Sequence, residues 1–212
     1  LSRGVMAVRF AILSLIVTGM VPGSLAAENW PQFRGPSGQG HTAATGLPVS
    51  WSDTKNVAWK VDVPGEGWSS PVVWGRRIFL TTAVADPVTE NQYSLGTLCF
   101  EAETGRVLWN VEVFKQTAVD TQRIHKKNSH ASPTPVTDGE RLWVHFGALG
   151  TACLSLDGKL LWQNRELDYE MRHGNGGSPV LAGGLLLFSC DGMSDPFVVA
   201  LDAMTGKVKW KQ

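Results

Sequence analysis

A tryptophan recurs through this chain at intervals of roughly 50 residues, the period of a structural repeat. The 212 residues include nine tryptophans but only two tyrosines, so one aromatic residue type is used repeatedly. Each of the last three recurrences closes a similar phrase, in which a glycine followed by a lysine or arginine precedes the tryptophan. The recurrent tryptophans are Trp59, Trp109, Trp162 and Trp210, and the glycines are Gly105, Gly158 and Gly206. A chain of this kind folds as an array of similar units.

Each repeat is predicted to contain two hairpins. A small polar residue and a glycine between two apolar runs mark a tight turn, because glycine tolerates the positive φ that such turns require. The apolar runs before these glycines, at 97–102, 151–156 and 198–203, are expected to be the third strand of their repeats. A second phrase lies upstream in each repeat and opens with Pro71, Pro135 or Pro179. Proline suits the first residue of a strand because it has no N–H to donate.

Four strands in a repeat of this length, with a recurrent tryptophan, are typical of a β-propeller blade. The sequence therefore predicts an all-β protein in which residues 57–212 form a partial propeller. About three four-stranded blades are expected, near 64–113, 131–163 and 177–212. Closed propellers have about four to eight blades, so the ring is expected to be incomplete. A natural short form and a fragment of a longer protein both remain open.

The first 26 residues are predicted to be a signal peptide. Arg3 and Arg9 provide the positive end, residues 10–21 form an apolar run, and small residues fit a cleavage site at 24–26. Residues 27–56 then form an N-terminal extension of the mature protein, which is expected to be secreted or periplasmic. The apolar run is too short to cross a bilayer comfortably, so no stable membrane span is expected after cleavage. An uncleaved anchor is the alternative.

Charge and cysteine content narrow the class of protein further. Nineteen basic residues balance nineteen acidic residues, so no overall field attracts nucleic acid, and no nucleic-acid partner is expected. The three cysteines, Cys99, Cys153 and Cys190, cannot all pair within one chain. A bridge from Cys153 to either of the others is the alternative to a role as small buried apolar residues. The second role is favoured, because Cys99, Cys153 and Ala200 align at one place in the repeat.

Two polar loops precede the first strands of the second and third blades, at 125–130 and 172–177. Ligands of propellers usually bind at one mouth of the channel. The ligand-binding candidates are therefore His125, Asn128, His130, Arg172, His173 and Asn175. His130 and His173 are expected at similar places in adjacent blades, where two imidazoles could bind a metal or transfer a proton. The alternative is that these side chains cap turns, and that Lys126 and Lys127 are solvated rather than bound to an anionic partner.

Asp191 and Asp195 are the metal candidates. Carboxylates suit calcium, so these two residues could supply oxygen ligands from the loop at 189–196. The favoured alternative is an ordinary turn, because Asp-Gly is a common turn dipeptide.

The repeat phrase ALDAMTGKVKW, at 200–210, resembles the tryptophan-docking repeat of pyrroloquinoline quinone (PQQ)-type propellers, and the resemblance covers roughly residues 57–212. It implies that the tryptophan closing each blade packs against the neighbouring blade, and that Trp59, within 57–63, belongs to the last strand of a split or closing blade. The segment 29–42 is similar to the mature N-terminus of exported members. The chain departs from the quinoprotein dehydrogenases of this family by lacking an adjacent cysteine pair. It also lacks the lipid-attachment cysteine of the outer-membrane assembly propeller.

The resemblance implies two functions. The first is a binding or scaffold module in the cell envelope, with a protein partner or another propeller segment that completes the ring. The alternative is a PQQ-dependent dehydrogenase, or a fragment of one, which would use PQQ and calcium to oxidise an alcohol or sugar. No catalytic residue is assigned by the sequence.

Overall fold

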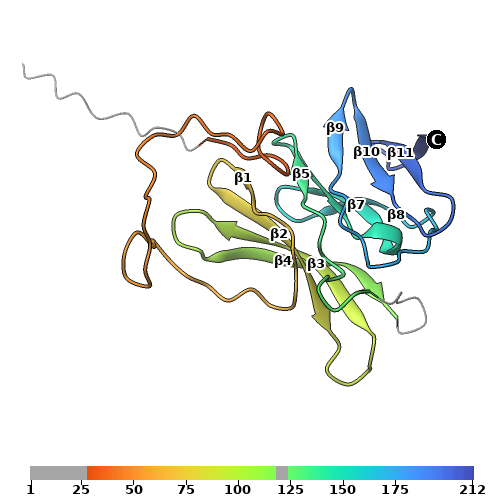
Figure 1. Cartoon of the computed structure of the whole chain (residues 1–212), viewed down its shortest axis with the longest axis horizontal. Coiled ribbons are helices and arrows are strands. Elements are labelled where there is room, and N and C mark those ends of the chain that lie inside the picture. Colours follow the sequence, from red (N-terminus) through yellow and green to blue (C-terminus); the bar gives the residue numbers. More distant parts are fainter. Residues whose placement is uncertain (1–27, 118–123) are drawn as a thin grey trace, which may run out of the picture.

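The structure is a computed structural model that describes residues 28–117 and 124–212. The described residues form three four-stranded antiparallel sheets and one short 3-10 helix, Gly147–Leu149 (Figure 1). The predicted signal peptide, residues 1–26, lies outside the described residues. Within the described ranges, no helix is both long and apolar enough to cross a membrane.

Each sheet is a meander in which every strand pairs with the next strand along the chain. The first sheet, blade 1, contains β1 (Val72–Trp74), β2 (Arg77–Ala85), β3 (Tyr93–Glu101) and β4 (Val107–Gln116). Blade 2 contains β5 (Val136–Thr137), β6 (Arg141–His145), β7 (Thr151–Ser155) and β8 (Leu160–Asn164). Blade 3 contains β9 (Val180–Ala182), β10 (Leu185–Cys190), β11 (Phe197–Asp202) and β12 (Val208–Lys211). The prediction of three four-stranded blades in an all-β chain is confirmed, and the ring is not closed.

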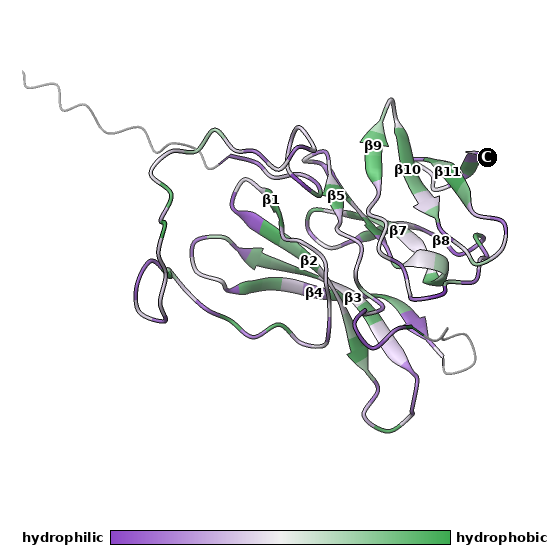
Figure 2. Ribbon diagram, viewed as in Figure 1, coloured by the Kyte–Doolittle hydropathy of each residue, from purple (hydrophilic) through white to green (hydrophobic). Residues whose placement is uncertain are grey.

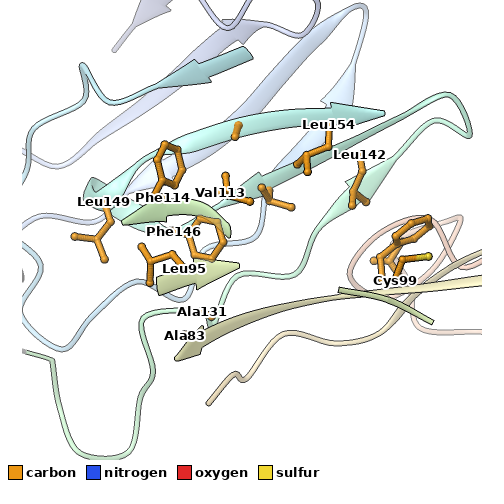
Figure 3. Packing of buried hydrophobic residues seen from close by; sticks show 14 residues of the cluster. Ala83, Leu95, Cys99, Val113, Phe114, Ala131, Leu142, Phe146, Leu149 and Leu154 are labelled. Atoms are coloured by element: carbon orange, nitrogen blue, oxygen red, sulfur yellow. The ribbon is translucent and has the colours of Figure 1, made fainter. Parts of the chain in front are cut away.

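The core lies between the blades rather than within any one of them. Successive side chains of a strand point to opposite faces, so Leu142 and Val144 of β6 face blade 1, whereas Trp143 between them faces blade 3. Figure 3 shows the first of these two layers, in which Leu95 and Phe114 of blade 1 lie beside Phe146, the residue after β6. In Figure 2, hydrophobic residues, coloured green, occupy much of the length of the strands. Each blade therefore depends on its neighbours for burial.

The three cysteines are buried and unpaired, so neither of the disulfides considered from the sequence forms. Cys99 lies opposite Trp109 in the strand register, Cys153 lies opposite Trp162, and Ala200 lies opposite Trp210. The small-residue position inferred from the repeat is thereby confirmed. Burial raises the pKa of the Cys99 and Cys153 thiols to about 12, which keeps them protonated and unreactive.

Three of the recurrent tryptophans dock onto the turn of the following blade. The indole N–H groups of Trp59, Trp109 and Trp162 donate to the carbonyl oxygens of Ala102, Leu156 and Ala203, at 2.9, 3.0 and 3.0 Å. The rings cover Gly105, Gly158 and Gly206, where a Cβ would lie only 2.5, 2.9 and 2.5 Å from an indole carbon. All three glycines have positive φ. Glycine is thus required at these turns both by the backbone and by the docked ring.

Trp59 reaches its place without a strand. Residues 57–63 form no β-ladder, so the prediction that Trp59 lies in the last strand of a blade is wrong for the described chain. The physical reason is that a strand needs a paired neighbour, and only the indole of this segment is anchored. The contact with Gly105 nevertheless repeats the docking seen between blades 1 and 2 and between blades 2 and 3.

The N-terminal extension is tied to the first strands of two blades. Trp30 forms an antiparallel bridge with Val73 of β1, and the Pro31 carbonyl accepts a hydrogen bond from the Thr137 N–H of β5 at 2.9 Å. The orange segment in Figure 1 follows this path past β1 to β5. The extension therefore connects blades 1 and 2 through their first strands, β1 and β5.

The buried side chain of His145 makes the free energy of unfolding depend on pH. His145 of β6 is fully buried, with its ring 4.1 Å from that of Phe188 and Nδ1 at 2.8 Å from Thr151 Oγ1. Burial lowers its pKa from 6.5 to about 3, because the charged imidazolium would lose its hydration. The unfolded chain binds this proton below about pH 6.5, whereas the folded chain does not bind it until about pH 3.

We therefore expect the free energy of unfolding to fall as the pH drops below about 6.5, with up to about 1.4 kcal/mol lost per pH unit for this one proton. His130, whose pKa is also lowered by burial, adds to the slope in the same direction. Urea unfolding between about pH 7 and pH 5 measures the effect above the range in which carboxylates titrate. The substitution His145→Gln should flatten the slope whatever its effect on absolute stability, and an unchanged slope would refute this account.

Candidate functional site

The loops that enter blades 2 and 3 meet at the same end of the two sheets. The His125 N–H donates to the His173 carbonyl at 3.2 Å. The Asn128 side-chain amide donates to the carbonyls of His173 and Asn175, at 2.9 and 3.4 Å. The imidazole rings of His125 and His173 stand edge to face, with centroids 5.6 Å apart. The two loops thus form one polar cluster.

An open cavity of about 370 Å³ lies at this junction, lined by His125, Lys127, Asn128 and His173. This volume is at the lower end of the range for small-molecule sites. None of these four lining residues carries a carboxylate, and two carry basic imidazoles and one an ammonium group. The cavity is therefore suited to a ligand that offers hydrogen-bond acceptors.

Most acceptor atoms of the lining side chains are already used by neighbouring groups. The Lys127 N–H donates to His125 Nδ1 at 3.2 Å. The side-chain oxygen of Asn128 accepts from the Ser129 N–H at 2.9 Å and from the Ser132 hydroxyl. A neutral His125 that accepts at Nδ1 carries its proton on Nε2. The site consequently presents donors to the cavity.

The predicted site residues are only partly brought together. His125, Asn128 and His173 line the cavity, and Asn175 joins the cluster through its carbonyl. Arg172 is exposed and is not among the lining residues. Lys127 lines the cavity, although the sequence offered no more than a pair of adjacent lysines as a signal for it.

His130 does not pair with His173 as the sequence alignment of the blades suggested. His130 is buried and packs against Tyr93 of blade 1, with ring centroids 4.5 Å apart. Burial lowers the pKa of the His130 imidazole, so this ring favours the neutral form. The histidine that meets His173 is His125, because the loop backbone turns between His125 and Asn128.

The two metal candidates lie in the loop between β10 and β11 without assembling a set of ligands. Asp191 accepts a hydrogen bond from the Ser189 hydroxyl at 3.0 Å, and Asp195 occupies a turn with a φ of 51°. Among residues 28–117 and 124–212, no group of three or more histidine, cysteine, aspartate or glutamate side chains is placed to hold a metal ion. Calcium takes six to eight oxygen ligands, and Asp191 and Asp195 are not joined by a third such side chain in the part of the chain that the structure describes.

A second cavity, of about 430 Å³, lies between the N-terminal extension and the start of blade 3. Its walls come from two stretches of the chain, 32–38 and 176–180, and include Phe33, Arg34 and Val180. No repeat phrase points to this cavity, because the extension has no repeat counterpart.

Three meander sheets with tryptophans docked from each blade onto the next define a protein of the β-propeller repeat class. The family described as outer membrane protein assembly factor BamB matches residues 34–164 and 95–212. The chain belongs to this family of PQQ-like repeat proteins. Among curated protein sequences, none matches.

Solved structures of similar fold include two kinds of dehydrogenase. A europium-containing methanol dehydrogenase is 14% identical, with a TM-score of 0.53 over 74% of this chain and 26% of its own. Quinohemoprotein alcohol dehydrogenases from Pseudomonas putida and Comamonas testosteroni are 16% and 15% identical, with TM-scores of 0.51 and 0.50. They are matched over 72% and 70% of this chain. This chain spans 21% of each of them, and at such identities the likeness shows the fold alone.

Proposed function

We propose that this chain is a binding and scaffold module of the cell envelope, and that a further propeller repeat, from a protein partner or from another propeller segment, packs against β12. One observation carries the proposal. Trp210 of β12 is equivalent to the three docked tryptophans, yet it has no following blade in the described chain and remains 40% exposed. Val198 and Val208, on the adjacent strands β11 and β12, are also exposed. An exposed apolar surface of this kind favours a protein partner.

The docking geometry indicates what the partner offers. The partner needs a turn whose glycine leaves room for the indole of Trp210. It also needs a carbonyl oxygen just before that glycine to accept the indole N–H. The three equivalent glycines of this chain, Gly105, Gly158 and Gly206, are already covered by indoles. A second copy of the chain therefore has no free turn for Trp210, and a different repeat segment is the partner that fits.

The location in the envelope rests on the predicted signal peptide at 1–26 and on the family, whose description names an outer membrane protein assembly factor. Amino-terminal sequencing of the protein from the periplasmic fraction tests the location. Cleavage after residue 26 is the expected result, and a retained leader in the cytoplasm would contradict it.

A photo-crosslinking amino acid in place of Trp210 tests the proposed partner. We expect an adduct in which the linked peptide contains the glycine turn of another propeller repeat, because that turn is what an indole at this position covers. The same amino acid in place of Val88, which is exposed in the loop between β2 and β3, is the matched control and should give no such adduct. Absence of an adduct from position 210, or a linked peptide without a repeat turn, would contradict the proposal.

The alternative of a PQQ-dependent dehydrogenase has the support of a shared fold, which does not decide function because one fold hosts many activities. Adding PQQ and calcium to the purified chain with an alcohol and a dye acceptor separates the two functions. Dye reduction that depends on PQQ would establish the enzyme and overturn the scaffold proposal.

A further inference from the structure

We propose that the cavity between the loops entering blades 2 and 3 binds a small anion, with a carboxylate or phosphate group held by His125, Lys127 and His173. The inference deepens the proposed binding function and rests on it, since it assigns a ligand class to a second part of the same module. It follows from which hydrogen-bonding groups remain available, from the charges of the lining residues and from the protonation that the His125 contacts require.

The hydrogen bonds within the cluster occupy the side-chain acceptors of His125 and Asn128 and leave the side-chain donors of His125 and Lys127 without a partner among the described residues. The His173 carbonyl accepts from both the His125 N–H and the Asn128 amide, and the Asn128 oxygen accepts from two groups on its own loop. The Lys127 ammonium forms no ion pair within the described residues. Its donors, and Nε2–H of His125, are therefore left for a ligand that accepts hydrogen bonds.

The charge of the lining favours an anion over a neutral acceptor. None of the described lining residues carries a carboxylate, and Arg172, next to His173 in sequence, is an exposed cation. Hydrogen bonds from cationic donors to an anionic oxygen are shorter and stronger than those between neutral groups. The cavity of about 370 Å³ accommodates a phosphate or a small carboxylic acid.

The tautomer of His125, with its proton on Nε2, disfavours binding of a metal ion at that nitrogen. A histidine that binds a metal through Nε2 normally donates the other ring N–H to an acceptor. Nδ1 of His125 instead receives the Lys127 N–H, so coordination through Nε2 would place two donors against each other. The same contact holds the ring with Nε2–H available to an anion.

Titration of the purified chain with inorganic phosphate, and separately with citrate, tests the inference at low ionic strength. We expect saturable changes in the imidazole NMR signals of His125 and His173 with at least one of the two anions, and the comparison shows whether phosphate or carboxylate is preferred. Lys127→Gln should weaken binding by roughly two- to fivefold, as for an exposed charge pair. Lys126→Gln, which removes the same charge from a residue outside the lining, is the matched control and should change binding little.

Three results would overturn the inference. The first is no saturable change with either anion, and the second is equal weakening by the two lysine variants. The third is a titration with zinc in which both imidazoles bind zinc although they bind neither anion. Both lysines are exposed, so the variants should keep the unfolding midpoint of the parent chain, and this can be checked by circular dichroism. The titration needs no protein partner. A failed cross-link at position 210 together with specific anion binding would reject only the proposed partner, whereas the reverse outcome would reject only the anion site.

Discussion

Trp162→Ala is expected to lower the free energy of unfolding by about 3 kcal/mol, within the range seen when large aromatic side chains are removed from packed sites. The indole packs against the buried residues shared by blades 2 and 3, covers Gly206, and donates to the Ala203 carbonyl. Its removal opens a cavity between two blades and leaves a carbonyl with one donor fewer. Urea unfolding followed by far-ultraviolet circular dichroism measures the loss without relying on tryptophan fluorescence.

Trp210→Ala is the matched control for this prediction. The residue type and the place in the repeat are the same, but Trp210 is 40% exposed and covers no turn of a following blade. The loss of stability in the isolated chain should therefore be less than about 1 kcal/mol. Equal losses from the two variants would show that docking does not contribute to the stability of the blade array.

Gly206→Ala should destabilise the chain by about 2 to 4 kcal/mol, because two effects act together. The residue has a φ of 71°, which strains any residue with a Cβ. The added Cβ would also lie 2.5 Å from the docked indole of Trp162, and that ring is held by packing and by its hydrogen bond. The ring or the turn must therefore move.

Gly183→Ala separates the two effects within the same blade. Gly183 also has positive φ, at 56°, but a Cβ there would meet nothing within 4 Å. We expect this variant to cost only the backbone strain, about 1 kcal/mol. The difference in urea midpoint between the two variants measures the docking contact, and identical midpoints would mean that the indole adjusts without cost.

These contacts explain how a chain of separate meanders becomes one structure. Each four-stranded sheet exposes two apolar faces, and the alternation along β6 sends Leu142 towards one neighbour and Trp143 towards the other. In such an array stability is approximately the sum of the units and their interfaces. The apolar face of blade 3 that carries Trp210 is exposed in the described chain, and it is where we propose that a further repeat packs.

The repeat phrases were sufficient to predict the strands because turn glycines and alternating apolar residues are local signals. The runs at 97–102, 151–156 and 198–203 correspond to β3, β7 and β11 within a few residues. The placement of Trp59 was not predictable in the same way. Its phrase resembles an outer strand, but a strand also requires a partner to pair with, which is a property of the surrounding structure.

The candidate site was likewise predictable only in part. The sequence indicated the two loops, because both precede the first strand of a blade, but it paired His173 with His130 by counting residues from the prolines. The loop backbone decided otherwise: it buries His130 against Tyr93 and brings His125 beside His173. Residue counting cannot find this pairing, because irregular loops of different length do not keep a register.

The sequence by itself determined the blade period, the four-stranded repeat and the tryptophans that close each blade, since all of these repeat along the chain. Only the tertiary structure decided which tryptophan covers which glycine, that Trp59 docks without a strand, and that Lys127 joins two histidines around a cavity. Those facts depend on contacts between segments that are distant in sequence and on loops without a repeat. Local patterns carry no information on either.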